Sequence, residues 1–181
     1  PSFRTLGATA IKLPIKRDIV MQQLISYAVG VMMGRYRLDV GGLHIAHPDS
    51  TSEDIQSYTY NGQQVEIDED AIVPLMGAAG EFPDDAVHRF KQFLDIVWGA
   101  DTRTENMNFL QECLDKDLEA YMVKSFWKDH CKRYKKKPIY WLFSSPKGAF
   151  QVLVYMHRMN AFTVEKIRAN YLIPHLKNLR I

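Results

Sequence analysis

The feature that most constrains the fold is a pair of extended, apolar segments in the C-terminal third of the chain. Residues 139–144 and 149–157 are rich in β-branched and aromatic side chains, and the turn-forming residues 145–148 (SPKG) separate them. This pattern predicts a β-hairpin. The alternating side chains are apolar on both faces: Tyr140 and Leu142 on one, Ile139, Trp141 and Phe143 on the other. Such a hairpin has to be covered on two sides by the rest of the chain.

Helices supply most of that cover. Apolar residues recur at three- and four-residue spacing over 19–34, where Asp18 is a plausible N-cap: Ile19, Val20, Leu24, Tyr27, Ala28, Val31 and Met32. Further helices are predicted from Pro83 to about Trp98 (closed by Gly99), over 103–114 with a Thr102/Glu105 capping box, over 116–135, and from Thr163 to a kink or end at Pro174. A short hairpin is predicted over 58–65 and a short strand over 72–75.

These elements predict an α+β class that is mostly helical. A buried two-stranded hairpin at about 138–157 would pack among four or five helices in a single domain, 1–181. Apolar residues make up 46% of the 181 residues and charged residues 24%, which is a globular composition. The chain opens at Pro1 and stops within a predicted helix, so we expect a fragment of a larger protein.

No segment predicts a membrane span or a secretory signal. The longest uncharged run, 19–34, is short and contains glutamine and serine. Two cysteines, Cys113 and Cys131, are too few for a disulfide framework. We therefore expect a cytoplasmic protein that does not contact a membrane.

Charge is distributed in three blocks that the net charge of +2 conceals. Residues 1–44 carry six bases and two acids, residues 45–120 carry four bases and 17 acids, and residues 121–181 carry 13 bases and two acids. This asymmetry favours a nucleic acid or another acidic partner for the basic block. The alternative is that the acidic and basic blocks face each other within the fold.

The predicted helix over 116–135 carries the clearest functional signal. Lys124, Lys128 and Lys132 recur every four residues, and with Lys135 they fall within roughly 80° of a helix surface. Leu118, Met122 and Phe126 lie nearly opposite, and Tyr121 is expected to interleave with the lysines. The candidate DNA-binding residues are Lys124, Lys128, Lys132, Arg133, Tyr134, Lys135, Lys136 and Lys137, with Arg35 and Arg37 from the end of the first helix. A solvated surface helix is the alternative, and Arg35 and Arg37 are equally consistent with a helix C-terminal dipole.

Catalytic and metal-binding patterns are absent from the sequence. His44 and His47 are spaced as two ordinary loop histidines, and no Asp or Glu has a lysine two positions later, as a restriction-type nuclease would require. No phosphate-binding glycine loop or nucleophile elbow occurs. Asp84 and Asp85 are interpreted as acids that stabilise a helix N-terminus. We predict no catalytic residue and no metal ligand.

Four stretches together resemble a known family. They are residues 24–39 (LISYAVGVMMGRYRLD), 72–75 with 82–93 (IVPL and FPDDAVHRFKQF), 126–145 (FWKDHCKRYKKKPIYWLFSS) and 149–158 (AFQVLVYMHR). Their order and spacing are similar to the C-terminal half of the PglX-type adenine-specific DNA methyltransferases of bacteriophage exclusion (BREX) systems. The resemblance covers about residues 18–175.

The resemblance implies a parent enzyme that uses S-adenosylmethionine to methylate adenine in DNA. The chain itself lacks an Asn-Pro-Pro-Tyr motif and a Phe-x-Gly-x-Gly cofactor loop, so we expect a non-catalytic segment that binds no cofactor itself. Expected partners are double-stranded DNA, the methyltransferase core of the parent and other defence-system subunits. The expected function is DNA binding of the target-recognition type; the alternative is a scaffold that docks other subunits or an acidic DNA-mimic protein. Trp141 and Tyr134 are possible stacking residues, although core packing is the preferred interpretation for Trp141.

Overall fold

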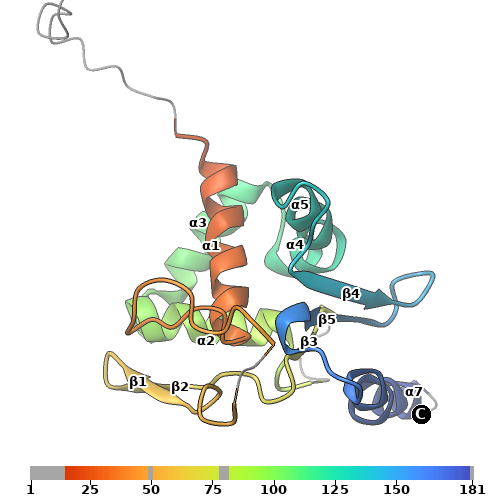
Figure 1. Ribbon diagram of the computed structural model, residues 1–181. Helices are drawn as coiled ribbons and strands as arrows, with labels where there is room; N and C mark the ends of the chain where they lie inside the picture. The colour runs from red at the N-terminus through yellow and green to blue at the C-terminus, as the bar shows by residue number, and fades with distance from the viewer. Residues whose placement is uncertain (1–14, 49–50, 78–81, 180–181) are drawn as a thin grey trace, which may run out of the picture.

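The computed structural model describes residues 15–48, 51–77 and 82–179, and it has an α+β fold that is mostly helical (Figure 1). The helices are α1 (Arg17–Met32), α2 (Ala86–Trp98), α3 (Arg103–Leu114), α4 (Leu118–Lys124), α5 (Phe126–Arg133), α6 (Thr163–Lys166) and α7 (Ile173–Asn178). The strands are β1 (Tyr58–Tyr60), β2 (Gln63–Val65), β3 (Ile72–Pro74), β4 (Tyr140–Ser144) and β5 (Gln151–Tyr155). Short helical turns occur at η1 (Ala100–Thr102), η2 (Met156–Arg158) and η3 (Ile167–Leu172).

The predicted C-terminal hairpin exists as β4 and β5, but it belongs to a three-stranded sheet. Its order is β3-β5-β4 and all pairs are antiparallel, with Ile72 opposite Val154 and Trp141 opposite the same valine. The hairpin and the short strand are both confirmed, but the sequence did not predict that they pair, because pairing with β3 is a long-range contact that local periodicity does not encode. The separate β1–β2 hairpin and its Asn61-Gly62 turn are confirmed, with φ of 49° and 74°.

The central strand of the sheet is buried on both faces, whereas its edge strand is not. All five residues of β5 are buried. On β4, Tyr140 is 1% exposed but Trp141 is 45% exposed. Core packing was therefore the wrong interpretation for Trp141, since it stands at the open edge of the sheet.

Two apolar clusters cover the two faces of the sheet. Tyr140, Leu153 and Tyr155 pack with residues of α1, α2, α4 and α5. The opposite face packs Val152 and Val154 against the C-terminal helical segment. Figure 1 shows the sheet between α4–α5 and α7. The hairpin thus fixes α5 against one face and leaves the other side of that helix free.

Helix α1 departs from the simple amphipathic stripe that its sequence predicts. Ile19 and Val20 are 38% and 43% exposed, while residues 28–32 are buried without a break. The last five residues of α1, 28–32, are therefore enclosed on all sides. Lys16, not Asp18, occupies the N-cap position, and Asp18 lies in the first turn.

Gly30 explains one close approach on α1. A Cβ at this position would lie 2.4 Å from a ring atom of Tyr36 and 3.2 Å from the Tyr140 hydroxyl. The glycine thus makes room for two aromatic side chains.

The ends of α2 are largely as expected, and the start of α3 is not. Asp85 is the N-cap of α2 and accepts a hydrogen bond from the Val87 amide at 2.8 Å, and Gly99 follows the helix with φ of 95°. The predicted capping box of α3 does not form. The Thr102 hydroxyl instead donates to the Gly99 carbonyl at 3.0 Å, because a 3₁₀ turn precedes the helix.

The predicted helix over 116–135 is two helices. Ser125 separates α4 from α5 with φ of −118°, and its hydroxyl accepts a hydrogen bond from the Lys116 ammonium at 3.1 Å. Serine side chains compete with helical backbone hydrogen bonds and favour such interruptions. Asp117 caps α4 by accepting a hydrogen bond from the Ala120 amide at 2.6 Å.

The last predicted helix continues past Pro174 with altered geometry. Helices α6 and α7 are joined by the π-helical turn η3, and Pro174 lies in the first turn of α7. Proline has no amide hydrogen to donate, and the wider π turn before it accommodates that loss. Thr163 does not cap the helix; it is the first helical residue, and its hydroxyl accepts from the Asn160 amide at 3.0 Å. Within the described ranges, no helix combines the length and apolar character that crossing a bilayer requires.

Candidate nucleic-acid interface

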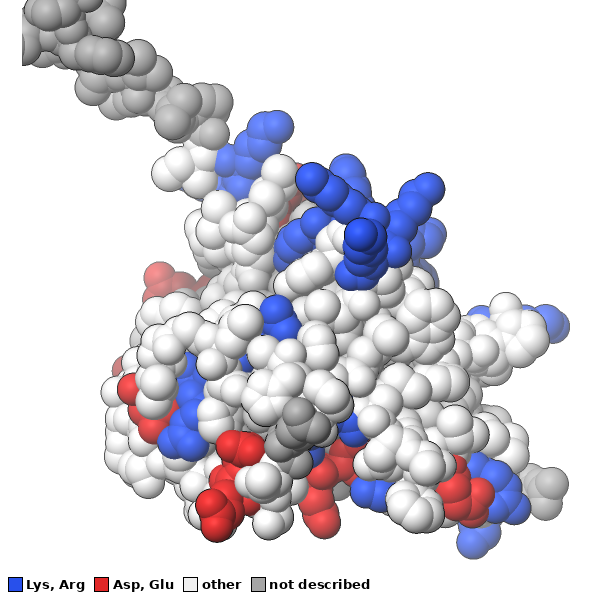
Figure 2. All heavy atoms as spheres, viewed as in Figure 1, with Lys and Arg blue, Asp and Glu red and all other residues white. Residues whose placement is uncertain are grey.

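A basic surface covers the outer side of α5 and the turn that follows it. Its residues are the exposed lysines Lys124, Lys128, Lys132, Lys135, Lys136 and Lys137, together with Lys16 and Arg17 at the start of α1. Figure 2 shows Lys and Arg side chains gathered over α5 and the start of α1, while most acidic side chains in this view lie toward the opposite end. The break at Ser125 does not bury any of the lysines.

Packing holds α5 with its lysines outward. Leu118, Met122 and Phe126 are 1%, 0% and 2% exposed, as the helical periodicity predicts. Tyr121 does not interleave with the lysines: it is 2% exposed, and its hydroxyl donates to Asp129 at 3.0 Å. This hydrogen bond engages the one acidic residue of α5.

The basic surface is not neutralised by the acidic block. In the described part of the chain, every ion pair joins residues of the same charge block: Arg37–Asp39, Arg89–Asp68, Arg103–Asp95 and Arg168–Glu165. None involves a lysine of the basic surface. The lysines therefore remain available for an external anion.

His130 fixes the buried side of α5 to the edge of the sheet. Its Nε2 accepts hydrogen bonds from the amides of Ile139 and Tyr140 at 3.2 and 3.4 Å. Its ring is 2% exposed and lies 4.9 Å from the Tyr140 ring. Burial, followed by the nearby Arg133 and Arg35 cations, lowers the pKa of His130 to about 4. The histidine is thus a neutral structural group at pH 7.

Arg133 and Tyr134 lie at the inner border of the basic surface. Both are half-buried. Arg133 reaches α1, where its Nη1 donates to the Gln22 carbonyl at 3.5 Å. Tyr134 lies 4.7 Å from the His130 ring, and burial raises its pKa. These two side chains attach α5 to its neighbours.

Arg35 and Arg37, unlike the lysines of the basic surface, are bonded to other side chains of the fold. Arg35 donates through Nη1 to the Tyr155 hydroxyl at 3.1 Å and through Nε to the Tyr36 hydroxyl at 3.3 Å. Arg37 forms a two-point ion pair with Asp39 at 2.9 and 2.7 Å and stacks on the Tyr58 ring at 4.1 Å. Both guanidinium groups thus already have partners within the fold.

The turn after α5 presents two lysines in an unusual backbone conformation. Lys135 and Lys136 have φ of 51° and 63°, the left-handed region that side chains with a Cβ disfavour. The Lys136 amide donates to the Cys131 carbonyl at 2.8 Å, and the Lys137 amide donates to the Tyr134 carbonyl at 2.8 Å. These bonds end the helix and hold three consecutive lysines at its tip.

The sequence interpretation did not include Lys16 and Arg17 among the candidate DNA-binding residues. They are distant in sequence from α5, and the two helices meet only in the folded chain, through contacts that include the Arg133 hydrogen bond to Gln22. Their own signal, a small basic cluster before the first helix, was present but pointed to no partner.

Asp68, Asp84 and Asp85 are engaged inside the fold. Asp68 is 7% exposed and pairs with Arg89 at 2.9 Å. Burial raises its pKa to about 7, although the Arg89 cation opposes this rise. Asp84 accepts a hydrogen bond from the Tyr171 hydroxyl at 2.8 Å, and Asp85 bonds the amides of α2 and of Met76. The interpretation of Asp85 as a helix-stabilising acid is confirmed.

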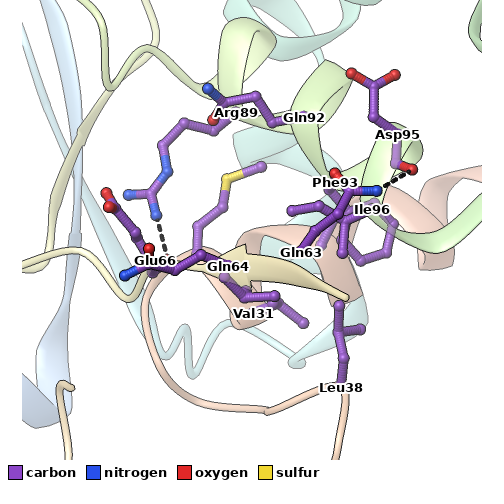
Figure 3. A pocket seen from close by; sticks show the side chains of 13 residues that line it. Val31, Leu38, Gln63, Gln64, Glu66, Arg89, Gln92, Phe93, Asp95 and Ile96 are labelled. Atoms are coloured by element: carbon purple, nitrogen blue, oxygen red, sulfur yellow. Dashed lines mark hydrogen bonds between the residues drawn. The ribbon is translucent and has the colours of Figure 1, made fainter. Parts of the chain in front are cut away.

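A pocket of about 560 Å³ lies between α1, α2 and β2 (Figure 3). Its apolar wall includes Val31 and Phe93, and glutamines 63, 64 and 92 line its polar side. Two of its charged groups are already bonded: Arg89 donates to the Glu66 backbone carbonyl at 2.7 Å, and Asp95 pairs with Arg103. The exposed Glu66 carboxylate adds negative charge at its border, which does not favour an anionic ligand.

The histidine pair considered for metal binding is bonded differently. Nε2 of His44 lies 2.7 Å from the Asp54 carbonyl oxygen. Across the described ranges, no group of three or more histidine, cysteine or acidic side chains is arranged to hold a metal ion.

No family model matches the chain. Two relatives are similar over most of it. An adenine-specific methyltransferase BrxX of Escherichia coli O9:H4 (strain HS) is 41% identical over 174 residues, which covers 88% of this chain and 14% of the relative. An adenine-specific methyltransferase PglX of Lacticaseibacillus casei (strain Zhang) is 34% identical over 171 residues, covering 88% of this chain and 13% of the relative. The chain thus corresponds to one segment of much longer methyltransferases, and the resemblance to PglX-type enzymes is confirmed.

Proposed function

Because this chain is similar along most of its length to one segment of the BrxX and PglX adenine-specific methyltransferases, we propose that it is a DNA-binding segment of such an enzyme in a phage-defence (BREX) system. Its role is to hold double-stranded DNA beside the catalytic core of the parent protein. The observation that carries the proposal is the basic surface of α5, whose six lysines are exposed and form no described ion pair.

The geometry of the basic surface suits phosphate binding. Lysine is a compact point charge on a flexible stem, so it attracts phosphates without reading the bases. Lys124, Lys128 and Lys132 spread along α4 and α5, and Lys135 to Lys137 extend the positive charge beyond the helix tip. Contacts of this type give affinity and register, while the reading of sequence requires other side chains in a groove.

The left-handed backbone conformation of Lys135 and Lys136 also supports the proposal. A left-handed conformation costs a residue with a Cβ roughly 1 kcal/mol, and glycine would avoid that cost. Lysines at these two positions reduce stability and add positive charge at the most exposed point of α5. This combination is typical of a site that favours binding over stability.

The methyl donor, S-adenosylmethionine, is proposed to bind elsewhere in the parent enzyme. The chain has no glycine-rich cofactor loop, and Gln63, Arg89 and Asp95 at the pocket between α1 and α2 are bonded within the fold. The contribution of this segment is therefore to position DNA and not to transfer the methyl group.

A second function, docking of other subunits of the defence complex, is favoured by the C-terminal segment. Its exposed apolar residues include Phe162 at 70% and Val164 at 61%. Exposed apolar side chains that gather on one segment often mark protein contacts. This surface and the basic surface can serve different partners in the same protein.

DNA binding is tested by fluorescence anisotropy with a labelled duplex across a salt series. The double variant Lys128→Glu with Lys132→Glu removes two phosphate contacts, so the log–log salt slope should flatten by about 1.8. The matched control is Lys147→Glu with Lys177→Glu, which makes the same charge change on exposed lysines of other elements. The control should keep the wild-type slope. Equal slopes for both double variants would contradict the proposal.

A further inference from the structure

Two tryptophans in contact, one exposed and one partly buried, lie at the border of the basic surface. Trp141 is 45% exposed at the open edge of the sheet, and its ring lies 5.7 Å from the ring of Trp127 at an angle of 76°. Trp127 directly precedes Lys128 on α5, and Lys124 is the last residue of α4, three positions earlier. The tryptophan pair is therefore attached to the segment that carries the lysines proposed to hold phosphates.

The position of Trp141 in the sheet keeps its ring accessible. β4 is an edge strand, so one side of Trp141 faces no further strand. Its cross-strand neighbour Val154 is fully buried. Trp127 is the single aromatic ring in contact with Trp141 in the described part of the chain. A perpendicular contact with Trp127 occupies at most one face of the Trp141 ring.

A solvent-exposed aromatic ring near several lysines is a combination found in proteins that bind nucleic acid. Proteins that bind single-stranded nucleic acid combine a positively charged track for the backbone with aromatic side chains on which bases stack. In a duplex, the faces of the bases are covered by their neighbours. Only an unpaired base offers a free face to an indole ring.

We propose that Trp141, supported by Trp127, is a stacking platform for an unpaired base of DNA whose flanking phosphates lie on the lysines of α5. This inference rests on the proposed DNA-binding function and adds a ligand class to it, unpaired nucleotides. Charge favours this occupant over a neutral or basic protein segment, because Lys124 and Lys128, on either side of Trp127 in the sequence, attract an anionic partner.

The experiment compares three labelled ligands of equal length: a single strand, the same strand with abasic sites in place of its bases, and the duplex. The abasic strand keeps every phosphate and removes only the stacking faces. The wild-type chain should bind the intact strand about tenfold more tightly than the abasic strand. Trp141→Leu should reduce this ratio of affinities to about one, and Trp141→Phe, which keeps an aromatic ring, should give an intermediate ratio.

The matched control is Trp98→Leu, which removes the 48% exposed tryptophan at the end of α2. It should leave the ratio of intact to abasic affinity unchanged. Thermal unfolding of each variant establishes that it is folded. If Trp141→Leu is folded and its affinities for the intact and the abasic strand fall by the same factor, Trp141 is not a stacking platform.

The outcomes also separate this inference from the DNA-binding proposal. If the lysine variants flatten the salt slope while the wild-type chain binds intact and abasic strands alike, the platform is wrong and the phosphate-binding function stands. If the lysine variants leave the slope for every ligand unchanged, the DNA-binding proposal fails and the platform fails with it.

Discussion

The buried aspartates Asp68 and Asp85 and the lysines of the basic surface both come from charge-dense parts of the sequence, but their charges have opposite roles. Asp68 and Asp85 are 7% and 4% exposed, and each is bonded to groups inside the fold. The lysines of α5 are exposed and form no described ion pair. Charge density in a sequence therefore does not reveal function by itself. The burial and the partners of each charge distinguish a structural set, the buried and bonded aspartates, from a binding set, the exposed lysines of the basic surface.

The largest expected change in the free energy of unfolding comes from removing one partner of the buried Arg89–Asp68 ion pair. Arg89→Ala leaves Asp68 buried without its cation, and at pH 9, where the wild-type carboxylate is ionised, the loss of one partner of such a pair costs about 3–5 kcal/mol. Urea denaturation should show this decrease in the free energy of unfolding. The DNA salt slope of the variant, measured where it is still folded, should equal that of the wild type.

The matched control for this prediction is Arg103→Ala. Arg103 also pairs with an aspartate, Asp95, but its side chain is 46% exposed. Exposed pairs contribute about 1 kcal/mol or less. Similar losses for the two variants would show that burial does not distinguish the two kinds of charge.

The second prediction concerns pH and the buried side of α5. The pKa of His130 is about 4 in the folded chain against an ordinary value of 6.5. Between these values the unfolded chain binds a proton that the folded chain does not, so this contribution to stability is present above pH 6.5 and is lost as the pH falls toward 4. The loss amounts to about 3 kcal/mol, at 1.36 kcal/mol per unit of pKa.

His130→Gln removes the titrating group and keeps a hydrogen-bond acceptor. The difference in unfolding free energy between wild type and variant, measured in denaturant at pH 7.5 and at pH 4.5, should shift in favour of the variant as the pH falls. His88→Gln, at an exposed histidine on α2, is the control substitution. A wild-type-to-variant difference for His130→Gln that stays constant with pH would contradict the assignment.

The sequence predicted those parts of the fold whose signals are local. The bounds 103–114 for α3, the end of α2 at Gly99 and the turn of the β1–β2 hairpin are specified by periodicity and by single turn residues. The outward direction of the α5 lysines also followed from helical spacing, because the apolar residues opposite them had to be buried.

The features that the sequence did not predict depend on long-range contacts. The pairing of β3 with β5 joins residues about 80 positions apart. Trp141 is 45% exposed although Tyr140 before it is 1% exposed, and no local pattern encodes this difference because both side chains are aromatic. The engagement of Arg35 by Tyr155 spans 120 positions. Only the folded structure therefore shows which arginines and aromatic residues are bonded inside the fold and which remain accessible.

The smallest expected effect on stability tests whether the tip of α5 favours binding at the expense of stability. Lys136 has φ of 63°, which glycine adopts without a steric cost. Lys136→Gly should therefore raise the free energy of unfolding by about 0.5–1 kcal/mol. It should also flatten the DNA salt slope by about 0.9, because one phosphate contact is lost.

The neighbouring Lys137 gives the control, because it is equally exposed and lies outside the left-handed region. Lys137→Gly should flatten the slope in the same way but lower the free energy of unfolding, since the greater flexibility of glycine in the unfolded chain is not offset by relief of strain. Denaturant unfolding and anisotropy on the two variants give both quantities. Opposite changes in stability with equal changes in slope would place Lys136 in the binding set. A stability loss in both variants would mean that the left-handed turn carries no strain and that a lysine there has no cost for the fold.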